Sequence, residues 1–110
     1  MSTVTLAHAT ALARLGYALS DQTRTRILLE LRAAPACPSD LAEALGVSRQ
    51  VMSNQLACLR GCGLVDSVPD GRRTWYRLAG DALAPALDGL LDLAVAVDAS
   101  CCGPEGCACS

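Results

Sequence analysis

Hydrophobic residues recur at helical spacing in several parts of the chain, and one of these parts also carries most of the reactive groups. In residues 48–63, SRQVMSNQLACLRGCG, the apolar residues Met52, Leu56 and Leu59 are four and three positions apart, the period of a helix with one buried face. Ser48 is a suitable N-cap, and the two glycines near the end favour termination. The pattern predicts an amphipathic helix with polar residues on its other faces.

Two helices are predicted earlier in the chain. Leucine and alanine at helical spacing indicate a first helix over about residues 5–19, and a second helix follows Ser20-Asp21 and ends before Pro35. In the second helix we expect one apolar face turned inward and the arginines around it: Ile27, Leu28 and Leu31 inside, and Arg24, Arg26 and Arg32 outside.

A short third helix is predicted to open at residues 38–40 and to stop at Gly46, just before Ser48. A short helix, a Gly-containing turn and a longer helix with a polar start form the helix-turn-helix layout. A plain helical hairpin is the alternative, but the polar N-terminal face favours DNA binding. The residues expected to touch base edges and phosphates are Ser48, Arg49, Gln50, Ser53 and Asn54.

Residues 64–78 predict a β-hairpin. Residues 64–68 favour a short strand, residues 69–72 a turn containing the Asp-Gly hairpin signal, and residues 73–78 a return strand. A two-stranded hairpin is marginal alone, so it should pack on the helices as a wing does. Its tip carries Arg72 and Arg73, which we expect to contact DNA backbone or minor groove.

The segment 81–98 predicts a last helix with leucine and valine on more than one face. A small monomer cannot cover that much apolar surface, so we expect a dimer interface formed together with the first helix. The expected fold is mainly α with a β-hairpin wing, a homodimeric winged helix-turn-helix. We expect residues 1–98 to form the DNA-binding and dimerisation domain, and residues 99–110 to form a flexible Cys-rich metal-binding tail.

Charge is divided unevenly along the chain. The net charge of −2 combines +3 over residues 1–77, which hold all nine basic residues, with −5 over residues 78–110. Every basic residue is arginine, which is suited to bidentate contacts with phosphate and guanine. The basic part therefore coincides with the predicted DNA-reading head, although a solvated surface with chance asymmetry would have the same composition.

Seven cysteines are present, an odd and high number for 110 residues. The sequence shows no secretory signal and no apolar run of membrane-spanning length, so we expect a cytoplasmic protein without a membrane partner. In that reducing compartment thiols bind metal or react rather than form structural disulfides. Cys58 and Cys62 are four apart and share a helix face. The alternative for Cys58 alone is a small buried hydrophobe, which is also what we expect of Cys37.

Three motifs together resemble the ArsR/SmtB family of winged-helix metal-sensing repressors: LSDQTRTRILLEL (19–31), DLAEALGVSRQVMSNQLACLRGCGLV (40–65) and DGRRTWYRL (70–78). LACLRGCGLV is also similar to the cadmium- and lead-sensing CmtR branch of that family. The resemblance implies that Cys58 and Cys62 bind metal with a third cysteine from the partner subunit's tail, matching Cys102 here. This chain departs from the branch in having more tail cysteines, so Cys101, Cys107 and Cys109 stay open as ligands.

The donor chemistry agrees with a soft ion. Thiolates select soft ions, and Zn(II) on four cysteines is chemically possible. The resemblance implies that the ion is Cd(II) or Pb(II), with As(III) as the alternative. The function we expect is a repressor that binds double-stranded operator DNA as a metal-free homodimer and is released by cadmium or lead. Alternatives are an arsenite-responsive repressor that uses the tail cysteines, a thiol redox-sensing repressor, or a metal-sequestering protein. No active-site motif is evident, so an enzyme is not expected.

Overall fold

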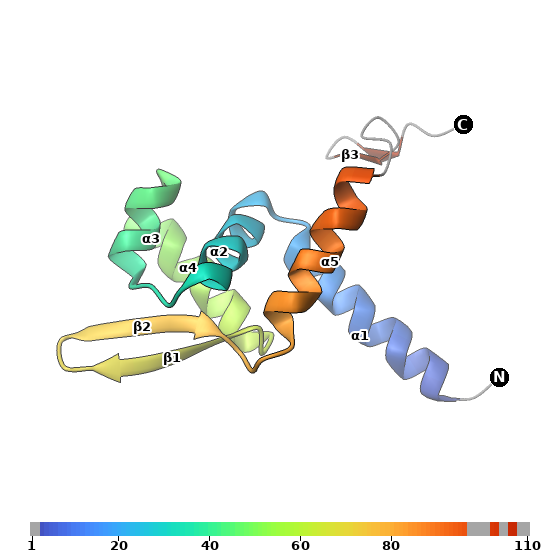
Figure 1. The fold of residues 1–110 in the computed structure, drawn as a ribbon, viewed down its shortest axis with the longest axis horizontal. Coiled ribbons are helices and arrows are strands. Elements are labelled where there is room, and N and C mark those ends of the chain that lie inside the picture. The colour runs from blue at the N-terminus through green and yellow to red at the C-terminus, as the bar shows by residue number, and fades with distance from the viewer. Residues whose placement is uncertain (1–2, 97–101, 104–105, 108–110) are drawn as a thin grey trace. The chain divides into compact units, whose positions relative to one another are not determined.

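The computed structural model of the protein describes residues 3–96, 102–103 and 106–107, with side chains for residues 6–96 (Figure 1). Two compact units are distinguished, Met1–Gly80 and Asp81–Ser110. The first holds helices α1 to α4 and the hairpin β1–β2. The second holds α5 and two very short strands. The winged helix-turn-helix elements all lie in the first unit.

Helices α1 (Thr3–Leu19), α2 (Gln22–Ala33) and α3 (Pro38–Leu45) follow the expected order and boundaries. The Asp21 side chain caps α2 by accepting hydrogen bonds from the backbone N–H groups of Thr23 and Arg24. The helix ends before Pro35, with Ala34 extended. Gly46 ends α3 at φ 70°, a left-handed conformation that glycine adopts without a Cβ penalty.

Helix α4 (Arg49–Gly61) is the long amphipathic helix that the sequence predicts. The Ser48 hydroxyl accepts the N–H of Val51 at its start. Its end is a Schellman motif, in which Leu64 N–H donates to the Leu59 carbonyl while Gly63, at φ 78°, reverses the chain. The stripe Met52, Leu56 and Leu59 is fully buried, as the period predicts.

Strands β1 (Val65–Asp70) and β2 (Arg73–Leu78) form the antiparallel wing. The predicted turn is displaced by one residue: Asp70 pairs with Arg73, so the loop is Gly71–Arg72 and not Asp70-Gly71. Gly71 alone has positive φ in this loop. The register places Pro69 opposite Thr74, next to the closing pair and therefore at a non-hydrogen-bonded position. Its missing N–H costs no ladder bond there, which explains why a proline fits inside the strand.

The wing is anchored to the helices by backbone bonds as well as by packing. Tyr76 N–H donates to the Ala36 carbonyl at 2.8 Å, and Ala36 N–H donates to the Tyr76 carbonyl at 3.0 Å. Val65 and the α2 residues Ile27, Leu28 and Leu31 lie in the core. The hairpin therefore gains a third backbone partner in the α2–α3 connection, which a two-stranded ribbon needs to be stable.

The second unit contains α5 (Leu83–Ala96) and the strand pair β3 (Cys102–Gly103) and β4 (Gly106–Cys107). Pro85 lies in the first turn of α5, where its missing N–H is tolerated. Most of α5 is exposed apolar surface, including Leu93 and Val95. None of the helices among the described residues is long and apolar enough to cross a membrane.

The two glycines at the end of α4 provide a test of the backbone geometry. Gly61 is helical, Gly63 has positive φ, and a Cβ added at either position meets nothing within 4 Å. We expect Gly61→Ala to raise the free energy of unfolding by about 0.5–1 kcal/mol. We expect Gly63→Ala to lower the free energy of unfolding by about 1 kcal/mol, because a residue with a Cβ is disfavoured in the left-handed backbone conformation. Urea denaturation measures both, and changes of the same sign would contradict the assigned helix end.

Candidate DNA-reading helix and thiol site

The N-terminal turns of α4 present polar side chains to solvent. All five residues predicted to contact DNA on this helix are exposed: Ser48, Arg49, Gln50, Ser53 and Asn54. The Gln50 amide donates to the Asn54 side-chain oxygen at 3.0 Å, so these two side chains are neighbours one turn apart. Because Met52 and Leu56 face the core, the burial of the helix fixes which residues are left to meet a partner.

The hairpin tip is a second polar surface. Arg72 lies in the two-residue loop and Arg73 opens β2, and both are exposed. Arg77 is also exposed further along β2. The arginines of the wing are therefore exposed, as contact with phosphate requires.

The two predicted metal-binding cysteines of α4 lie in the last turn and at its C-cap. Cys58 is partly buried and Cys62 is exposed, and the N–H of Cys62 donates to the Cys58 carbonyl at 3.0 Å. Both are free thiols. Residues joined by this helical bond are one turn apart on one face, which agrees with the predicted spacing. Among the described side chains, no three His, Cys, Asp or Glu residues are grouped so as to hold a metal ion.

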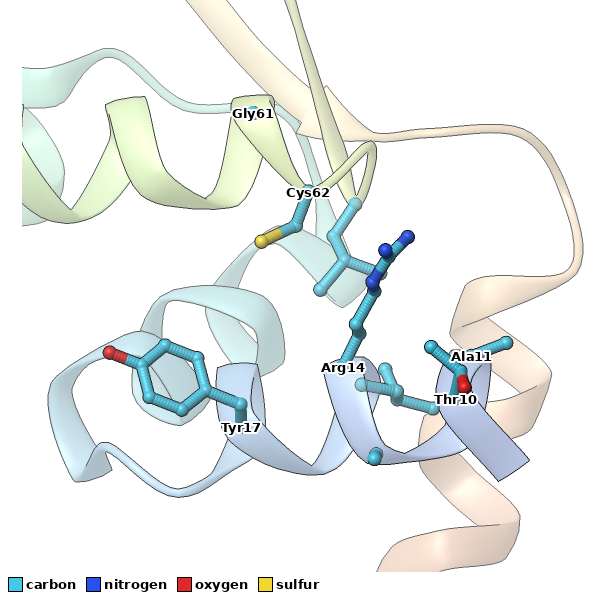
Figure 2. Close-up of a pocket in the computed structure, with 9 residues that line it drawn as sticks. Thr10, Ala11, Arg14, Tyr17, Gly61 and Cys62 are labelled. Atoms are coloured by element: carbon cyan, nitrogen blue, oxygen red, sulfur yellow. The ribbon is translucent and has the colours of Figure 1, made fainter. Parts of the chain in front are cut away.

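A cavity of about 850 Å³ lies beside Cys62 (Figure 2). Its walls come mainly from α1, including Arg14 and Tyr17, and from Gly61, Cys62 and Leu64 after the helix. In Figure 2 the Cys62 side chain points from the end of α4 toward α1. One of the two α4 thiols therefore borders a space large enough to admit a further chain segment.

The remaining cysteines differ in environment. Cys37 is 4% exposed at the start of α3, which confirms its expected role as a small buried hydrophobe. Cys101 and Cys109 lie outside the described residues. Cys102 and Cys107 are described by their backbone alone, where β3 and β4 pair antiparallel with Cys102 opposite Cys107.

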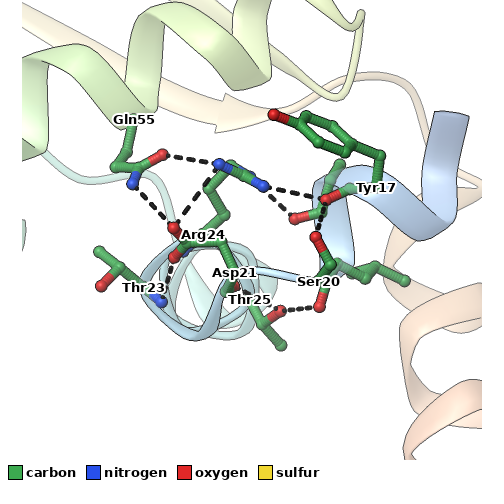
Figure 3. A network of polar contacts seen from close by, with 9 residues as sticks. Tyr17, Ser20, Asp21, Thr23, Arg24, Thr25 and Gln55 are labelled. Atoms are coloured by element: carbon green, nitrogen blue, oxygen red, sulfur yellow. Dashed lines mark hydrogen bonds and ion pairs between the residues drawn. The ribbon is translucent and has the colours of Figure 1, made fainter. Parts of the chain in front are cut away.

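One expectation is wrong: Arg24 does not lie on the outside of α2. The residue is only 8% exposed, and its guanidinium donates to the carbonyls of Ala18 and Tyr17 and to the Gln55 side-chain oxygen, at 3.0, 2.9 and 3.2 Å (Figure 3). Its Cζ atom lies 5.1 Å from the centre of the Tyr17 ring. Each polar bond compensates part of the cost of burying the charge.

Asp21 joins the same network from the start of α2. Its second carboxylate oxygen accepts from the Gln55 amide at 3.1 Å and lies 3.6 Å from an Arg24 nitrogen. The backbone N–H of Arg24 lowers the pKa of Asp21 most, the N–H of Thr23, the Arg24 charge and the Gln55 amide lower it further, and burial opposes them. The carboxylate is therefore held in its charged form.

Sequence reasoning missed Gln55, because its partners are distant in the chain, and Tyr17, because its partner Arg24 was expected on the outside of the second helix. A signal for Arg24 was present: it is three, four and seven positions before Ile27, Leu28 and Leu31, so it shares their buried face. Nothing local indicates that Gln55 meets residues 31 and 34 positions away.

Comparison with known proteins decides the family. Residues 21–67 match the family model described as bacterial regulatory protein, arsR family. The HTH-type transcriptional regulator CmtR of Mycobacterium tuberculosis H37Rv is 51% identical over 88 residues, which are 80% of this chain and 75% of CmtR. The chain belongs to the ArsR family. This family consists of transcriptional regulators, so the protein is not an enzyme.

Other ArsR-family members share the fold. The NMR structure of the cadmium metal-sensor CmtR from M. tuberculosis superposes with a TM-score of 0.68 at 45% identity, covering 89% of this chain and 98% of that one. A second structure is the homodimeric winged helix-turn-helix DNA-binding domain of a possible ArsR-family regulator from Mycobacterium bovis. It superposes with a TM-score of 0.78 at 29% identity, covering 86% of this chain and 88% of that one. The winged helix-turn-helix assignment is confirmed.

The Asp21 network gives a pH-dependent expectation. A carboxylate whose pKa is lower in the folded chain adds stability above its unfolded pKa of about 3.9, and that stability is lost as the pH falls through the folded value. Asp21→Asn keeps a capping oxygen and removes the charge, so the variant should be less stable at neutral pH and should match the wild type in strong acid. Denaturation midpoints over a pH series measure this.

Asp40→Asn serves as the control, because it removes an exposed carboxylate from the first turn of α3. If the denaturation midpoints of the wild type and Asp21→Asn differ by the same amount at every pH, the charge of Asp21 contributes nothing to stability.

Proposed function

We propose that the protein is a metal-responsive transcriptional repressor. As a metal-free homodimer it binds double-stranded operator DNA, and it leaves the DNA when cysteine thiolates bind a soft toxic ion, Cd(II) or Pb(II). As a DNA-binding regulator it acts in the cytoplasm.

The observation that carries this proposal is the placement of two chemistries on one helix. The polar reading face occupies the first turns of α4, and the thiols Cys58 and Cys62 occupy its end. A rigid helix transmits a displacement of one end to the other, so an ion that pulls on the thiols changes how the reading face meets DNA.

DNA contact is supported by exposure and charge. Arg49 on α4 and the two wing-tip arginines are exposed. By contrast, the side chain of Arg24 is bonded within the protein and that of Arg60 donates to Ser67. In a dimer the paired α4 helices would enter successive major grooves about one helical turn apart, and the wings would contact the backbone beside them.

Homodimer formation is supported by apolar surface that the single chain leaves uncovered. On α1, Leu6 and Leu12 are 72% and 68% exposed, and on α5, Leu93 and Val95 are 61% and 76% exposed. Large apolar side chains exposed to this extent on a helix are typical of an interaction site. The homodimeric relative from M. bovis has the same fold.

Metal binding is supported by the donor set and by the CmtR relative, a cadmium metal-sensor. Two thiolates from Cys58 and Cys62 do not complete the coordination of a soft ion, which needs at least a third donor. We assign that donor to the partner subunit's tail, with Cys102 as the first candidate and Cys101, Cys107 and Cys109 as further ones. The cavity beside Cys62 leaves room for such a segment.

A second candidate places the sensor in the tail itself. The register brings Cys102 and Cys107 opposite one another across β3–β4, which favours a dithiol site for arsenite or a redox-sensitive pair. Zinc on four cysteines belongs to the same alternative. Release by arsenite or peroxide that survives loss of Cys58 would favour it.

The metal site is tested with single cysteine variants. We expect Cys58→Ser and Cys62→Ser each to abolish most of the cadmium-induced loss of operator affinity, which is about 5- to 150-fold for a typical coupling of 1–3 kcal/mol. Metal-free operator binding should be unchanged. Fluorescence anisotropy on a labelled fragment of the protein's own promoter, under reductant, measures both quantities.

Cys37→Ala is the matched control, because it removes a thiol that is buried at the start of α3 and not on α4. Full cadmium-induced release by Cys58→Ser would exclude the α4 site.

The wing is tested through salt dependence. Arg72→Ala and Arg73→Ala should each weaken operator binding and lower the slope of log affinity against log salt concentration by about one, because one phosphate contact is lost. Arg14→Ala on α1 removes the same charge from an exposed position away from the reading face. If all three variants change the slope equally, the wing tip makes no specific phosphate contact.

A further inference from the structure

The network around Arg24 joins three helices of the first unit. Asp21 caps α2, Tyr17 belongs to α1, and Gln55 belongs to α4 (Figure 3). Gln55 follows the predicted base-contacting residues Ser53 and Asn54 directly, so whatever holds Gln55 also sets the rotation of the reading face.

Both ends of the Gln55 amide are used. Its oxygen accepts from Arg24 at 3.2 Å, and its nitrogen donates to Asp21 at 3.1 Å. These two partners also lie within 3.6 Å of each other as an ion pair. The Arg24 guanidinium can only donate and the Asp21 carboxylate can only accept. The Gln55 amide therefore satisfies both in one orientation, with its oxygen toward Arg24 and its nitrogen toward Asp21. Apolar packing of the buried stripe tolerates small rotations of α4, whereas these directional bonds do not.

Arg24 itself is fixed from the other side. Two of its nitrogens donate to the carbonyls of Ala18 and Tyr17 at the end of α1, and the Tyr17 ring lies over the guanidinium. Since Arg24 is 8% exposed, loss of one of these hydrogen-bond acceptors would leave a buried guanidinium N–H without a partner, which is costly. The guanidinium therefore transmits the position of α1 to Gln55.

Tyr17 also borders the cavity beside Cys62 (Figure 2). One ring thus faces the space next to a thiol of α4 and covers the cation that holds Gln55. A segment or ion that enters the cavity meets the same side chain on which the Arg24 network rests.

We propose that Gln55 is a positioning residue for DNA reading, and that the chain Tyr17–Arg24–Gln55 couples the cavity beside Cys62 to the reading face. The coupling half rests on the proposed function, and the positioning half does not. Filling the cavity displaces the Tyr17 ring, shifts the guanidinium and releases the amide that orients α4.

The positioning half is tested without metal. Gln55→Met keeps the length and packing of the side chain and removes both amide bonds. Operator affinity should fall about tenfold with the salt slope unchanged, because no phosphate contact is lost. A role in stability alone would lower the melting temperature and leave the affinity of the folded protein intact. Unchanged affinity, or a slope lowered by about one, would overturn the positioning role.

The coupling half is tested with two variants of the cavity wall. Tyr17→Leu keeps an apolar wall and the backbone carbonyl but removes the ring over Arg24. Thr10→Ala alters the same wall away from the network. For Tyr17→Leu at saturating cadmium we expect the cadmium-induced loss of operator affinity to shrink at least about fivefold. Thr10→Ala should behave as the wild type.

Equal cadmium responses of Tyr17→Leu and Thr10→Ala would overturn the coupling role. If the wild type itself shows no cadmium response, the proposed function and the coupling role fail together. The metal-free measurement on Gln55→Met still decides the positioning role in that case.

Discussion

Burial of one stripe on α4 determines what the rest of the molecule can do. Met52, Leu56 and Leu59 are fully buried, and removing any one of them would cost roughly 2–5 kcal/mol. Because these residues face inward, the helix must expose Ser53 and Asn54 at one end and Cys62 at the other. The helix-turn-helix, the wing and the thiol pair are arranged around this single packing constraint.

A stripe of aliphatic side chains holds a helix in place but specifies its rotation weakly. The Arg24–Asp21–Gln55 network fixes the rotation of α4 about its axis, because its three charged or polar groups satisfy one another in one geometry. Burial of an arginine is expensive, so a network of this kind contributes little net stability. The apolar stripe thus holds α4 in place and the polar network orients it. This arrangement suits a regulator whose reading helix keeps one orientation on DNA and changes it on release.

Most of the first unit could be predicted from the sequence, because its signals are local. Helical spacing located the helices, Ser20-Asp21 and Ser48 indicated two helix starts, and Gly46 and the pair Gly61 and Gly63 indicated two helix ends. The turn of the wing was wrong by one residue, since Asp-Gly is compatible with either of two adjacent turn positions and Pro69 fits the strand at a non-hydrogen-bonded site. Arg24 was misplaced because charge was given more weight than its spacing from Ile27. The partners of Gln55 are 31 and 34 residues away, so no local pattern could indicate them.

The central claim is that metal binding by the thiols and DNA binding by the reading face are linked through α4. Linkage is reciprocal, so the factor by which cadmium weakens operator binding must equal the factor by which operator DNA weakens cadmium binding. The most direct test is therefore to titrate cadmium into the free protein and into the protein saturated with its own promoter fragment, under reductant. The account predicts weaker cadmium binding in the complex, by about 5- to 150-fold. Equal cadmium affinity in the two titrations would contradict it.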